Sequence, residues 1–417
     1  MDAKQHVIEK ATLAKEAFRK LAIIDTVTKN KSLIAMADAL IENMDVILAA
    51  NSKDIQNGEE KGLSKALLDR LLLDEKRITS MAEGLREIAF LDDPIGEVIK
   101  MWKRPNNLQI GQIRVPLGVI GIIYEARPNV TVDAAGLCIK AGNAVVLRGG
   151  SEAINSNTTI AKIISDAAEK AGLPKGSINL IETTDREAAN AMMKLNGYID
   201  VLIPRGGAGL INAVVQNSTV PVIETGVGNC HIFVDESADL DNAVDIVINA
   251  KTQRPAVCNA METLLVHKNI VKEFLPKLSA KLESLGVEMR GCPTTQSIIS
   301  NAKPASEEDW ATEYLDLILA VRTVDSIDEA LEHIYKYGTK HSEAILTNNY
   351  ENSQRFLNEV DAAAVYINAS TRFTDGSEFG FGAEIGISTQ KLHARGPMGL
   401  KELTTTKYII YGQGQTR

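Results

Sequence analysis

The cysteine at position 258 has the strongest chemical context in this sequence. It lies in a turn, residues 253–260 (QRPAVCNA), between a helical pattern that ends at Asn249 and a strand-like run over 263–267. A thiol at such a junction can sit near a cation, here Arg254, and near backbone N–H groups that secondary structure does not use. Both favour the nucleophilic thiolate, a minor species at neutral pH for an ordinary pKa of about 8.5. The alternative is a cysteine that only packs in the core.

Two further segments combine glycine with arginine at the ends of predicted strands. They are Arg148, Gly149 and Gly150 after the strand 144–147, and Arg205, Gly206 and Gly207 after the strand 201–203. Each leads into a helical pattern, so glycines, free N–H groups and a guanidinium together favour binding of a phosphate. The alternative is two ordinary turns with solvated arginines. Two such turns on one sheet favour a dinucleotide or phosphate site, although no GxGxxG follows the first strand and 380–386 has the wrong spacing.

Composition limits what the protein can be. The chain has 417 residues, 45% of them hydrophobic and 24% charged, which predicts a globular protein of two or three domains. The net charge of −9 argues against nucleic-acid or anionic-membrane partners, and no apolar run approaches the roughly 20 residues that span a bilayer. The four cysteines lie far apart without metal-ligand spacing. We therefore expect a cytoplasmic enzyme without a metal.

The elements that must position these residues follow a strand–helix rhythm. Residues 1–90 have helical spacing, and short β-branched runs then alternate with helices. The predicted strands are 109–115, 119–124, 144–147, 178–181, 201–203, 220–223, 231–234, 264–266, 317–321, 344–346 and 364–367. Such alternation predicts parallel sheets covered on both faces, with ligands at the carboxyl ends of the strands. Residues 225–229 are the expected link between two α/β halves, and the glycine-rich loop 371–399 is expected to be functional.

The C-terminal tail is a predicted edge strand. Residues 406–411 (TKYIIY) are β-prone, and an exposed strand edge needs a partner. The strand 109–115 is the available partner, and the pairing can extend across a subunit boundary. We therefore expect a homo-oligomer, either a dimer or a tetramer.

Several motifs resemble one known family. The order of the glycine-rich turns, Glu224-Thr225-Gly226, a cysteine about thirty residues later and a C-terminal glycine-rich loop resembles the aldehyde dehydrogenase superfamily. Within it, the sequence is specifically similar to the γ-glutamyl phosphate reductases across essentially the whole chain. The motifs are 124–131 (YEARPNVT), 145–150 (VVLRGG), 204–207 (PRGG), 253–260 (QRPAVCNA) and 341–345 (HSEAI).

This resemblance implies a fold and a division into domains. The fold is aldehyde-dehydrogenase-like α/β, with two Rossmann-like parallel-sheet domains and a small β oligomerisation element. Residues 1–102 and 117–227 would form the cofactor-binding domain, and 228–399 the catalytic domain. Residues 103–116 and 400–417 would form the oligomerisation element.

The resemblance also implies an activity. The enzyme would reduce L-glutamyl 5-phosphate with NADPH to L-glutamate 5-semialdehyde and phosphate, the second step of proline biosynthesis. Cys258 would displace phosphate and carry a thioacyl intermediate, which accepts hydride far more readily than a carboxylate does. Glutamate 5-kinase is a candidate partner, because docking would shelter a labile acyl phosphate.

Roles for cofactor-binding residues follow from the same resemblance. Arg148, with no acidic residue aimed at the 2′ position, favours NADP over NAD. Arg205, Gly206 and Gly207 would lie at the pyrophosphate of the cofactor. Gly149 and Gly150 would also lie near its phosphates. Glu313 aligns with a glutamate that holds the nicotinamide ribose in relatives, or it is a surface carboxylate.

The remaining candidates concern the reaction itself. Glu224 stands where oxidative relatives have a general base, and here it would relay a proton or contact the nicotinamide. The oxyanion would be held by the Cys258 N–H and by the side-chain amide of Asn129 or Asn259. The substrate carboxylate and leaving phosphate need cations, for which the candidates are Arg127, Arg254, His393 and Arg395.

Two other functions compete with this interpretation. An oxidative, hydrolytic aldehyde dehydrogenase would use water and NAD, but the asparagine of that group falls near Ala126 here. A catalytically inactive nucleotide-binding relative would have kept only the fold, and an intact Cys258 beside Arg254 argues against it.

Overall fold

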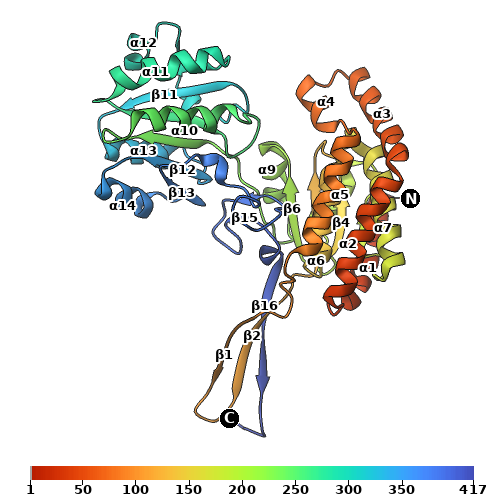
Figure 1. Ribbon diagram of the computed structural model, residues 1–417. Helices are drawn as coiled ribbons and strands as arrows, with labels where there is room; N and C mark the ends of the chain where they lie inside the picture. The colour runs from red at the N-terminus through yellow and green to blue at the C-terminus, as the bar shows by residue number, and fades with distance from the viewer. Residues whose placement is uncertain (1) are drawn as a thin grey trace. The chain divides into compact units, whose positions relative to one another are not determined.

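The computed structural model describes residues 2–417, the side chain of Ala66 excepted, and the chain separates into two compact units (Figure 1). The first unit comprises the residues up to Thr225 with 380–386 and 398–417. The second comprises 226–379 and 387–397. The division falls inside the segment 225–229, where the sequence placed a link.

A parallel four-stranded sheet forms the centre of the first unit. Its order is β5 (Ile178–Leu180), β4 (Ala144–Arg148), β3 (Val119–Tyr124) and β6 (Val201–Arg205). All six residues of β3 are buried, as expected for a central strand with helices on both faces. The helices that follow the strands are α6 (Asn129–Lys140), α7 (Ile154–Ala171), α8 (Arg186–Met193) and α9 (Ala208–Asn217). The predicted strand 220–223 is reduced to a parallel bridge between Val222 and Leu202 on the edge strand β6.

The N-terminal helices of the first unit are α1 (Ala3–Leu21), α2 (Thr26–Glu42), α3 (Met44–Glu60), α4 (Lys65–Leu71) and α5 (Glu75–Phe90). Their starts follow capping chemistry, since Asp25 and Asp74 accept hydrogen bonds from the N–H groups of Thr28 and Arg77. Helix α2 packs against α5 and α7, and α1 lies against β4. The long helical lead-in predicted from the sequence is therefore confirmed as a packing layer.

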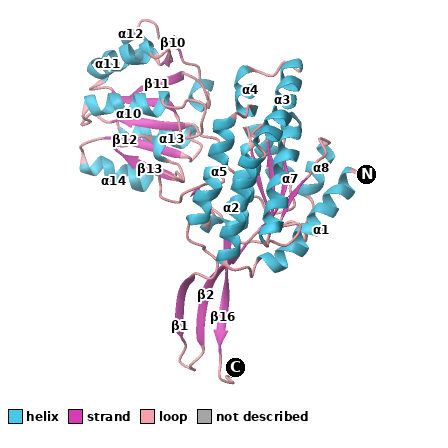
Figure 2. Cartoon of the chain, turned by 45° about the vertical axis from the view of Figure 1, so that its right-hand side comes forward, coloured by secondary structure: helices cyan, strands magenta, loops and turns pink. Residues whose placement is uncertain are grey.

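The second unit contains a larger parallel sheet (Figure 2). Its strands, in spatial order, are β10 (Lys303–Pro304), β9 (Glu288–Gly291), β11 (Ile318–Val324), β8 (Met261–His267), β7 (Cys230–Val234), β12 (Ser342–Leu346) and β13 (Ala364–Ile367). Its helices are α10 (Leu240–Thr252), α11 (Val271–Ser284), α12 (Pro293–Ile298), α13 (Ile327–Tyr337) and α14 (Tyr350–Glu359). Strand β8 is buried along its whole length, because α10 and α11 cover one of its faces and α13 and α14 cover the other. These two sheets confirm the predicted α/β class.

An antiparallel ribbon projects from the first unit in both views (Figures 1 and 2). It consists of β1 (Val98–Lys103), β2 (Gln109–Pro116) and β16 (Thr404–Tyr411), in that order. The predicted pairing of the tail with the strand 109–115 is confirmed, and it occurs within one chain. Strand β1 was not predicted, because it is exposed along nearly its whole length and so lacks the alternation that a buried face imposes.

The loop 371–399 is less irregular than the sequence suggested. It holds a 3₁₀ turn, η3 (Thr371–Phe373), and a short ladder of β14 (Ile387–Ser388) with β15 (Gly396–Pro397). No helix follows 380–386, as the sequence predicted for that glycine pattern. No helix in the described residues is both long and apolar enough to cross a bilayer.

Candidate active site

Cys258 lies in the turn between α10 and β8, as predicted. The helix ends at Thr252 and the strand begins at Met261, so the intervening residues have no regular ladder partners. The turn is closed by the N–H of Ala260, which donates to the carbonyl oxygen of Val257 at 3.1 Å. Cys258 is half-buried and Arg254 is exposed. The thiol thus combines solvent access with a rigid backbone.

Asn259, the residue after the predicted nucleophile, is held by a distant segment, 371–374. The Asn259 side chain is 4% exposed, and its Nδ2 donates to the carbonyl oxygens of Arg372 (3.3 Å) and Thr374 (2.8 Å). Thr371 Oγ1 donates to the Asn259 carbonyl at 2.8 Å, and Arg372 Nη1 donates to Asn259 Oδ1. Both N–H positions of this amide are occupied. The Asn259 amide therefore has no N–H left for an oxyanion in this arrangement.

The other side of the turn rests on residues 228–230. Cys230 is fully buried, and its thiol donates to the carbonyl oxygen of Cys258 at 3.2 Å. A Cβ added to Gly228 would lie 1.5 Å from that same oxygen, so only glycine fits there. The carboxylate of Glu313 accepts from the Gly228 N–H at 2.7 Å. Glu313 is thus placed beneath the nucleophile turn and is not simply a surface charge.

A buried ion pair supports the start of β8. Lys251 and Glu262 are both fully buried, with Nζ and Oε2 at 2.6 Å. Burial raises the pKa of Glu262 to about 7 and lowers that of Lys251. Glu262 Oε1 also accepts from the N–H of Leu315 at 3.1 Å. The pair therefore ties the residues on both sides of the nucleophile turn to the segment that carries Glu313.

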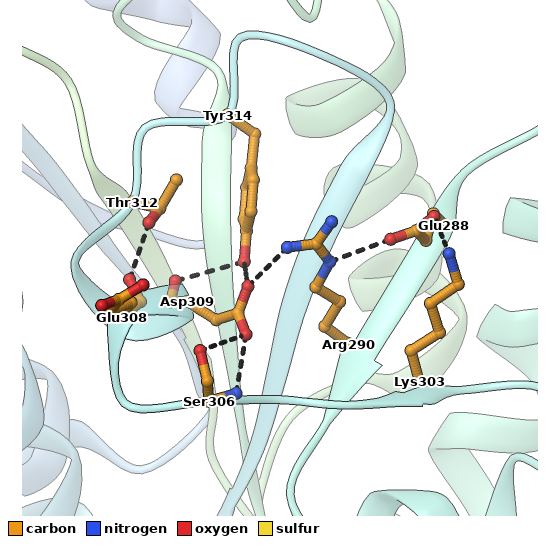
Figure 3. A network of polar contacts seen from close by, with 8 residues as sticks. All are labelled: Glu288, Arg290, Lys303, Ser306, Glu308, Asp309, Thr312 and Tyr314. Atoms are coloured by element: carbon orange, nitrogen blue, oxygen red, sulfur yellow. Dashed lines mark hydrogen bonds and ion pairs between the residues drawn. The ribbon is translucent and has the colours of Figure 1, made fainter.

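That segment is itself anchored by a network of polar contacts (Figure 3). Asp309 accepts from Arg290 Nη1 (2.7 Å), the Tyr314 hydroxyl (2.8 Å) and the N–H of Ser306 (2.6 Å). Burial raises the pKa of Asp309, but these hydrogen bonds outweigh it and hold the pKa at about 2. Arg290 continues to Glu288 at 2.9 Å, where Lys303 also binds at 2.6 Å (Figure 3). The carboxylate of Asp309 is thus a fixed anion that orients the chain leading to Glu313.

Arg395 and His393, the two predicted cations near the C-terminus, lie in the loop 371–399. Arg395 Nη2 donates to Asp361 at 2.7 Å, and Lys391 and Lys340 approach the same carboxylate at 3.0 and 3.5 Å. His393 is exposed and has a positive φ of 66°. The structure therefore gives Arg395 a carboxylate partner of its own.

In the first unit, the turn after β4 is tightly packed around two glycines. A Cβ on Gly149 would lie 2.1 Å from Asn157 Nδ2, and one on Gly150 would lie 2.3 Å from Glu152 Oε2. Arg148 Nη2 donates to the carbonyl oxygens of Thr184 and Asp185 at 3.2 and 3.4 Å. Its Nε is buried with no partner among the described residues, and burial lowers the pKa of the guanidinium. Arg148 therefore still has an N–H group that can donate to an anion.

The turn after β6 already binds a carboxylate. Glu125 accepts from the N–H of Gly207, the residue that caps α9, at 2.9 Å. A Cβ on Gly206 would lie 2.6 Å from Glu125 Cδ. The backbone at the start of α9 is therefore arranged to hold an anion, as its orphan N–H groups predict.

The strands β3, β4 and β6 are neighbours, so their carboxyl ends bring most of the remaining candidates together. Asn129 begins α6, is exposed and donates to Asp133 Oδ2 at 2.9 Å. Burial raises the pKa of Asp133 to about 6. Arg127 is exposed in the preceding turn, and its N–H donates to the Glu125 carbonyl. Glu224 precedes Thr225, whose hydroxyl donates to the Pro204 carbonyl at 3.0 Å, at the end of β6.

Sequence reasoning missed several residues of both regions. They are Glu125, Asn157, Gly228, Cys230, Thr371, Arg372 and Thr374. Cys230 lies two residues after Gly228, directly after the predicted link. The segment 371–374 carried no local signal, because it reaches Asn259 only through the fold. Among residues 2–417, no group of three or more His, Cys, Asp or Glu side chains is arranged to hold a metal ion.

Comparisons with known proteins agree with this architecture. A sequence model of the aldehyde dehydrogenase family matches residues 2–313. The γ-glutamyl phosphate reductases of Clostridium novyi and Clostridium acetobutylicum are 75% and 68% identical over 417 residues, covering all of each chain. The crystal structure of γ-glutamyl phosphate reductase from Thermotoga maritima superposes with a TM-score of 0.96 at 54% identity, over 99% of this chain and 100% of that one.

A more distant structure shares the fold alone. The acetylating aldehyde dehydrogenase of Geobacillus thermoglucosidasius matches with a TM-score of 0.71 at 20% identity, over 100% of this chain and 98% of that one. The chain therefore belongs to the aldehyde dehydrogenase family, and within that family to the γ-glutamyl phosphate reductases.

Proposed function

We propose that this enzyme reduces L-glutamyl 5-phosphate with NADPH, giving L-glutamate 5-semialdehyde and phosphate in proline biosynthesis. The observation that carries the proposal is the half-buried Cys258 in a turn held from both sides, with the cation Arg254 in the same turn. Full-length identity of 75% to a γ-glutamyl phosphate reductase supports the choice of substrate.

Cys258 is the proposed nucleophile. Its thiolate attacks the acyl carbon, phosphate leaves, and a thioester to Cys258 remains. Hydride addition and collapse of the thiohemiacetal then regenerate the thiolate and release the aldehyde. The Cys258 N–H and the Asn129 amide are the proposed oxyanion donors. Glu224 is proposed to relay a proton or to contact the nicotinamide.

The residues of the first unit fit a phosphorylated dinucleotide. The turn after β6 already holds a carboxylate on the Gly207 N–H, and the turn after β4 presents Arg148 with an unpartnered Nε. We propose that Arg148, Gly149 and Gly150 bind NADP(H) near the adenosine 2′-phosphate, and that Arg205, Gly206 and Gly207 bind the pyrophosphate. The cofactor supplies the hydride when bound. Glu313 is proposed to act through Gly228 or at the nicotinamide ribose.

Substrate anions need cations, and four remain proposed for this role. They are Arg127, Arg254, His393 and Arg395. Arg254 lies on the nucleophile turn itself, which supports it most directly. Arg395 would have to bind substrate while its other nitrogen is paired with Asp361.

The larger organisation is proposed along the same lines. Residues 1–102 and 117–227 would bind cofactor, and 228–399 would carry out catalysis. Residues 103–116 and 400–417 would mediate homo-oligomerisation, which the exposed Tyr408, Ile410 and Tyr411 on β16 support. Docking to glutamate 5-kinase and a cytoplasmic location complete the proposal.

Oxidation of glutamate 5-semialdehyde with NADP⁺ tests the reaction class. An acyl-phosphate enzyme needs inorganic phosphate or arsenate as the acyl acceptor, so NADPH formation should depend on either anion. Equal rates with and without them would indicate a hydrolytic aldehyde dehydrogenase instead.

The nucleophile is tested by Cys258→Ser, which should lower kcat by at least about 1,000-fold because an alcohol is far less ionised than a thiol. Cys292→Ser is the matched control, since Cys292 is also half-buried but lies at the start of α12. Activity retained by Cys258→Ser would overturn the assignment.

A further inference from the structure

The segment 371–374 lies 113 residues after the nucleophile, yet it grips the residue next to it. We propose that Arg372 is a positioning residue of the active site: its guanidinium locks Asn259 in place and provides positive charge beside the Cys258 thiolate. The inference rests on the proposed role of Cys258 as nucleophile.

Arg372 makes three separate connections to the nucleophile turn. Its Nη1 donates to Asn259 Oδ1, its Nε donates to Gln253 Oε1 at 2.8 Å, and its carbonyl accepts from Asn259 Nδ2 at 3.3 Å. Gln253 begins the turn that contains Cys258, and Asn259 follows Cys258 within it. A planar guanidinium that bridges these two residues fixes the turn in a way that a lysine cannot reproduce.

The segment that carries Arg372 is rigid. Thr374 Oγ1 is hydrogen-bonded at 2.7 Å to Ser342 Oγ on β12 and, at 2.7 Å, to the hydroxyl of Tyr366 on β13. Thr371 is fully buried and binds the Asn259 carbonyl. Arg372 is therefore attached to the central sheet of the second unit and is not a freely moving surface side chain.

The surroundings of Arg372 disfavour its positive charge, and a nearby anion would stabilise that charge. Burial lowers the pKa of Arg372, and Arg254 lowers it further, whereas Asp375 and Cys258 raise it. Two guanidinium groups that repel each other beside a thiol form a local field that favours the thiolate. The same field would favour an incoming acyl phosphate.

Other ionisable groups surround the turn from neighbouring elements. They are Arg254 in the turn, Asp375 after η3, Cys230 on β7, Glu262 on β8, Glu343 on β12 and Glu313 at Gly228. The carboxylates among them oppose formation of the Cys258 thiolate. Because Arg372 counters them, removing its charge should measurably change the pH at which Cys258 ionises.

The test is the pH dependence of Cys258 alkylation by iodoacetamide, followed by mass spectrometry on the full-length enzyme without substrate. Arg372→Gln removes a charge that interacts with Cys258 and should raise the midpoint pH by about one unit, the low end of the shift that an opposite charge causes. Arg372→Lys keeps a charge but loses the fork, so its midpoint should move less while kcat still falls. The KM for NADPH should stay unchanged in both variants.

Arg355→Gln is the matched control. Arg355 is another ion-paired arginine of the second unit, but it lies on α14, where it binds Asp328 and Glu359. The control should leave both the alkylation midpoint and kcat unchanged. If Arg372→Gln does not fold, the fall in kcat of Arg372→Lys at an unchanged KM for NADPH tests the positioning role.

An unchanged midpoint and kcat in a folded Arg372→Gln would overturn the proposal, and so would an equal shift in Arg355→Gln. These outcomes are distinct from failure of the proposed function. In that case Cys258→Ser would stay active, whatever the alkylation of the arginine variants shows.

Discussion

The two site regions of this enzyme are built by opposite means. The turns after β4 and β6 require glycine, since a Cβ at Gly149 would clash with Asn157 and one at Gly206 with Glu125. The nucleophile turn depends on side chains that are present, such as the amide of Asn259 and the buried pair of Lys251 and Glu262.

The difference follows from what each region must hold. A phosphate is bound by backbone N–H groups, so the backbone must be bare enough for close approach. A nucleophile must keep its own position while bonds form and break, and polar side chains from other elements provide that rigidity. Gly228 is the exception, because the Cys258 carbonyl packs directly on it. Substitutions should therefore damage the two regions in different ways.

The largest effect is expected from Lys251→Met. It leaves the Glu262 carboxylate buried without its cation, which costs about 3–5 kcal/mol in the free energy of unfolding. Urea denaturation measures the loss. The double variant Lys251→Met/Glu262→Leu should recover most of it, though not all, because the Leu315 N–H loses its acceptor.

A surface lysine gives the matched comparison. Lys277 is half-exposed and pairs with Asp241 and Glu273 at 3.5 and 3.4 Å. Lys277→Met should cost far less than Lys251→Met, because solvent screens an exposed ion pair. Similar losses in the free energy of unfolding for Lys251→Met and Lys277→Met would show that the buried pair beside the Cys258 turn contributes no more than a surface pair.

Asp309→Asn tests the network that holds the Glu313 segment. The folded pKa of Asp309 is about 2, below the ordinary 3.8, so its contribution to stability is present above pH 3.8 and is lost as pH falls through 2. The variant should cost about 2 kcal/mol at pH 7 and about half of that at pH 3. Urea unfolding at both pH values is the measurement, and a pH-independent difference would contradict the assigned pKa.

Gly149→Ala tests the opposite principle in the first unit. Overpacking a tight site costs about 1–3 kcal/mol, so the Kd for NADPH should rise about tenfold. Fluorescence titration with NADPH gives this value, and adding Asn157→Ala should restore part of the affinity by making room for the methyl group. The rate of Cys258 alkylation should not change, and a parallel loss there would mean that the two regions are not built independently.

The smallest effect is expected at glycines that lie in neither site region. Gly84 lies inside α5 with no atom within 4 Å of an added Cβ, so Gly84→Ala should stabilise the protein by about 0.5–1 kcal/mol. Gly62 has equally open surroundings but a φ of +71°, and Gly62→Ala should destabilise by about 1 kcal/mol. Thermal melting of both variants separates space from backbone conformation as the reason for a glycine.

Local sequence was sufficient where one segment makes its own structure. The junction around Cys258 was predicted because a helical period stops and a strand-like run begins within about a dozen residues. The glycine turns were predicted because glycine, arginine and a following helix are contiguous. The family resemblance added the reaction, the cofactor and the proposed roles, which composition and spacing alone did not give.

Contacts made by distant segments could not be predicted from the sequence. The Asn259 amide is occupied by residues 371–374. The carboxylate of Glu313 accepts from the N–H of Gly228, 85 residues earlier in the chain. The strand 220–223 had the composition of a strand, yet only Val222 forms a bridge.

Periodicity and backbone preferences act over a few residues, so the two parallel α/β halves, the glycine turns and the junction at Cys258 could be predicted from local sequence. The occupancy of polar groups depends on the fold, because hydrogen bonds and Coulomb interactions depend on distance in space. Arg372 and Asn259, 113 positions apart in the chain, become hydrogen-bond partners when residues 371–374 reach the Cys258 turn.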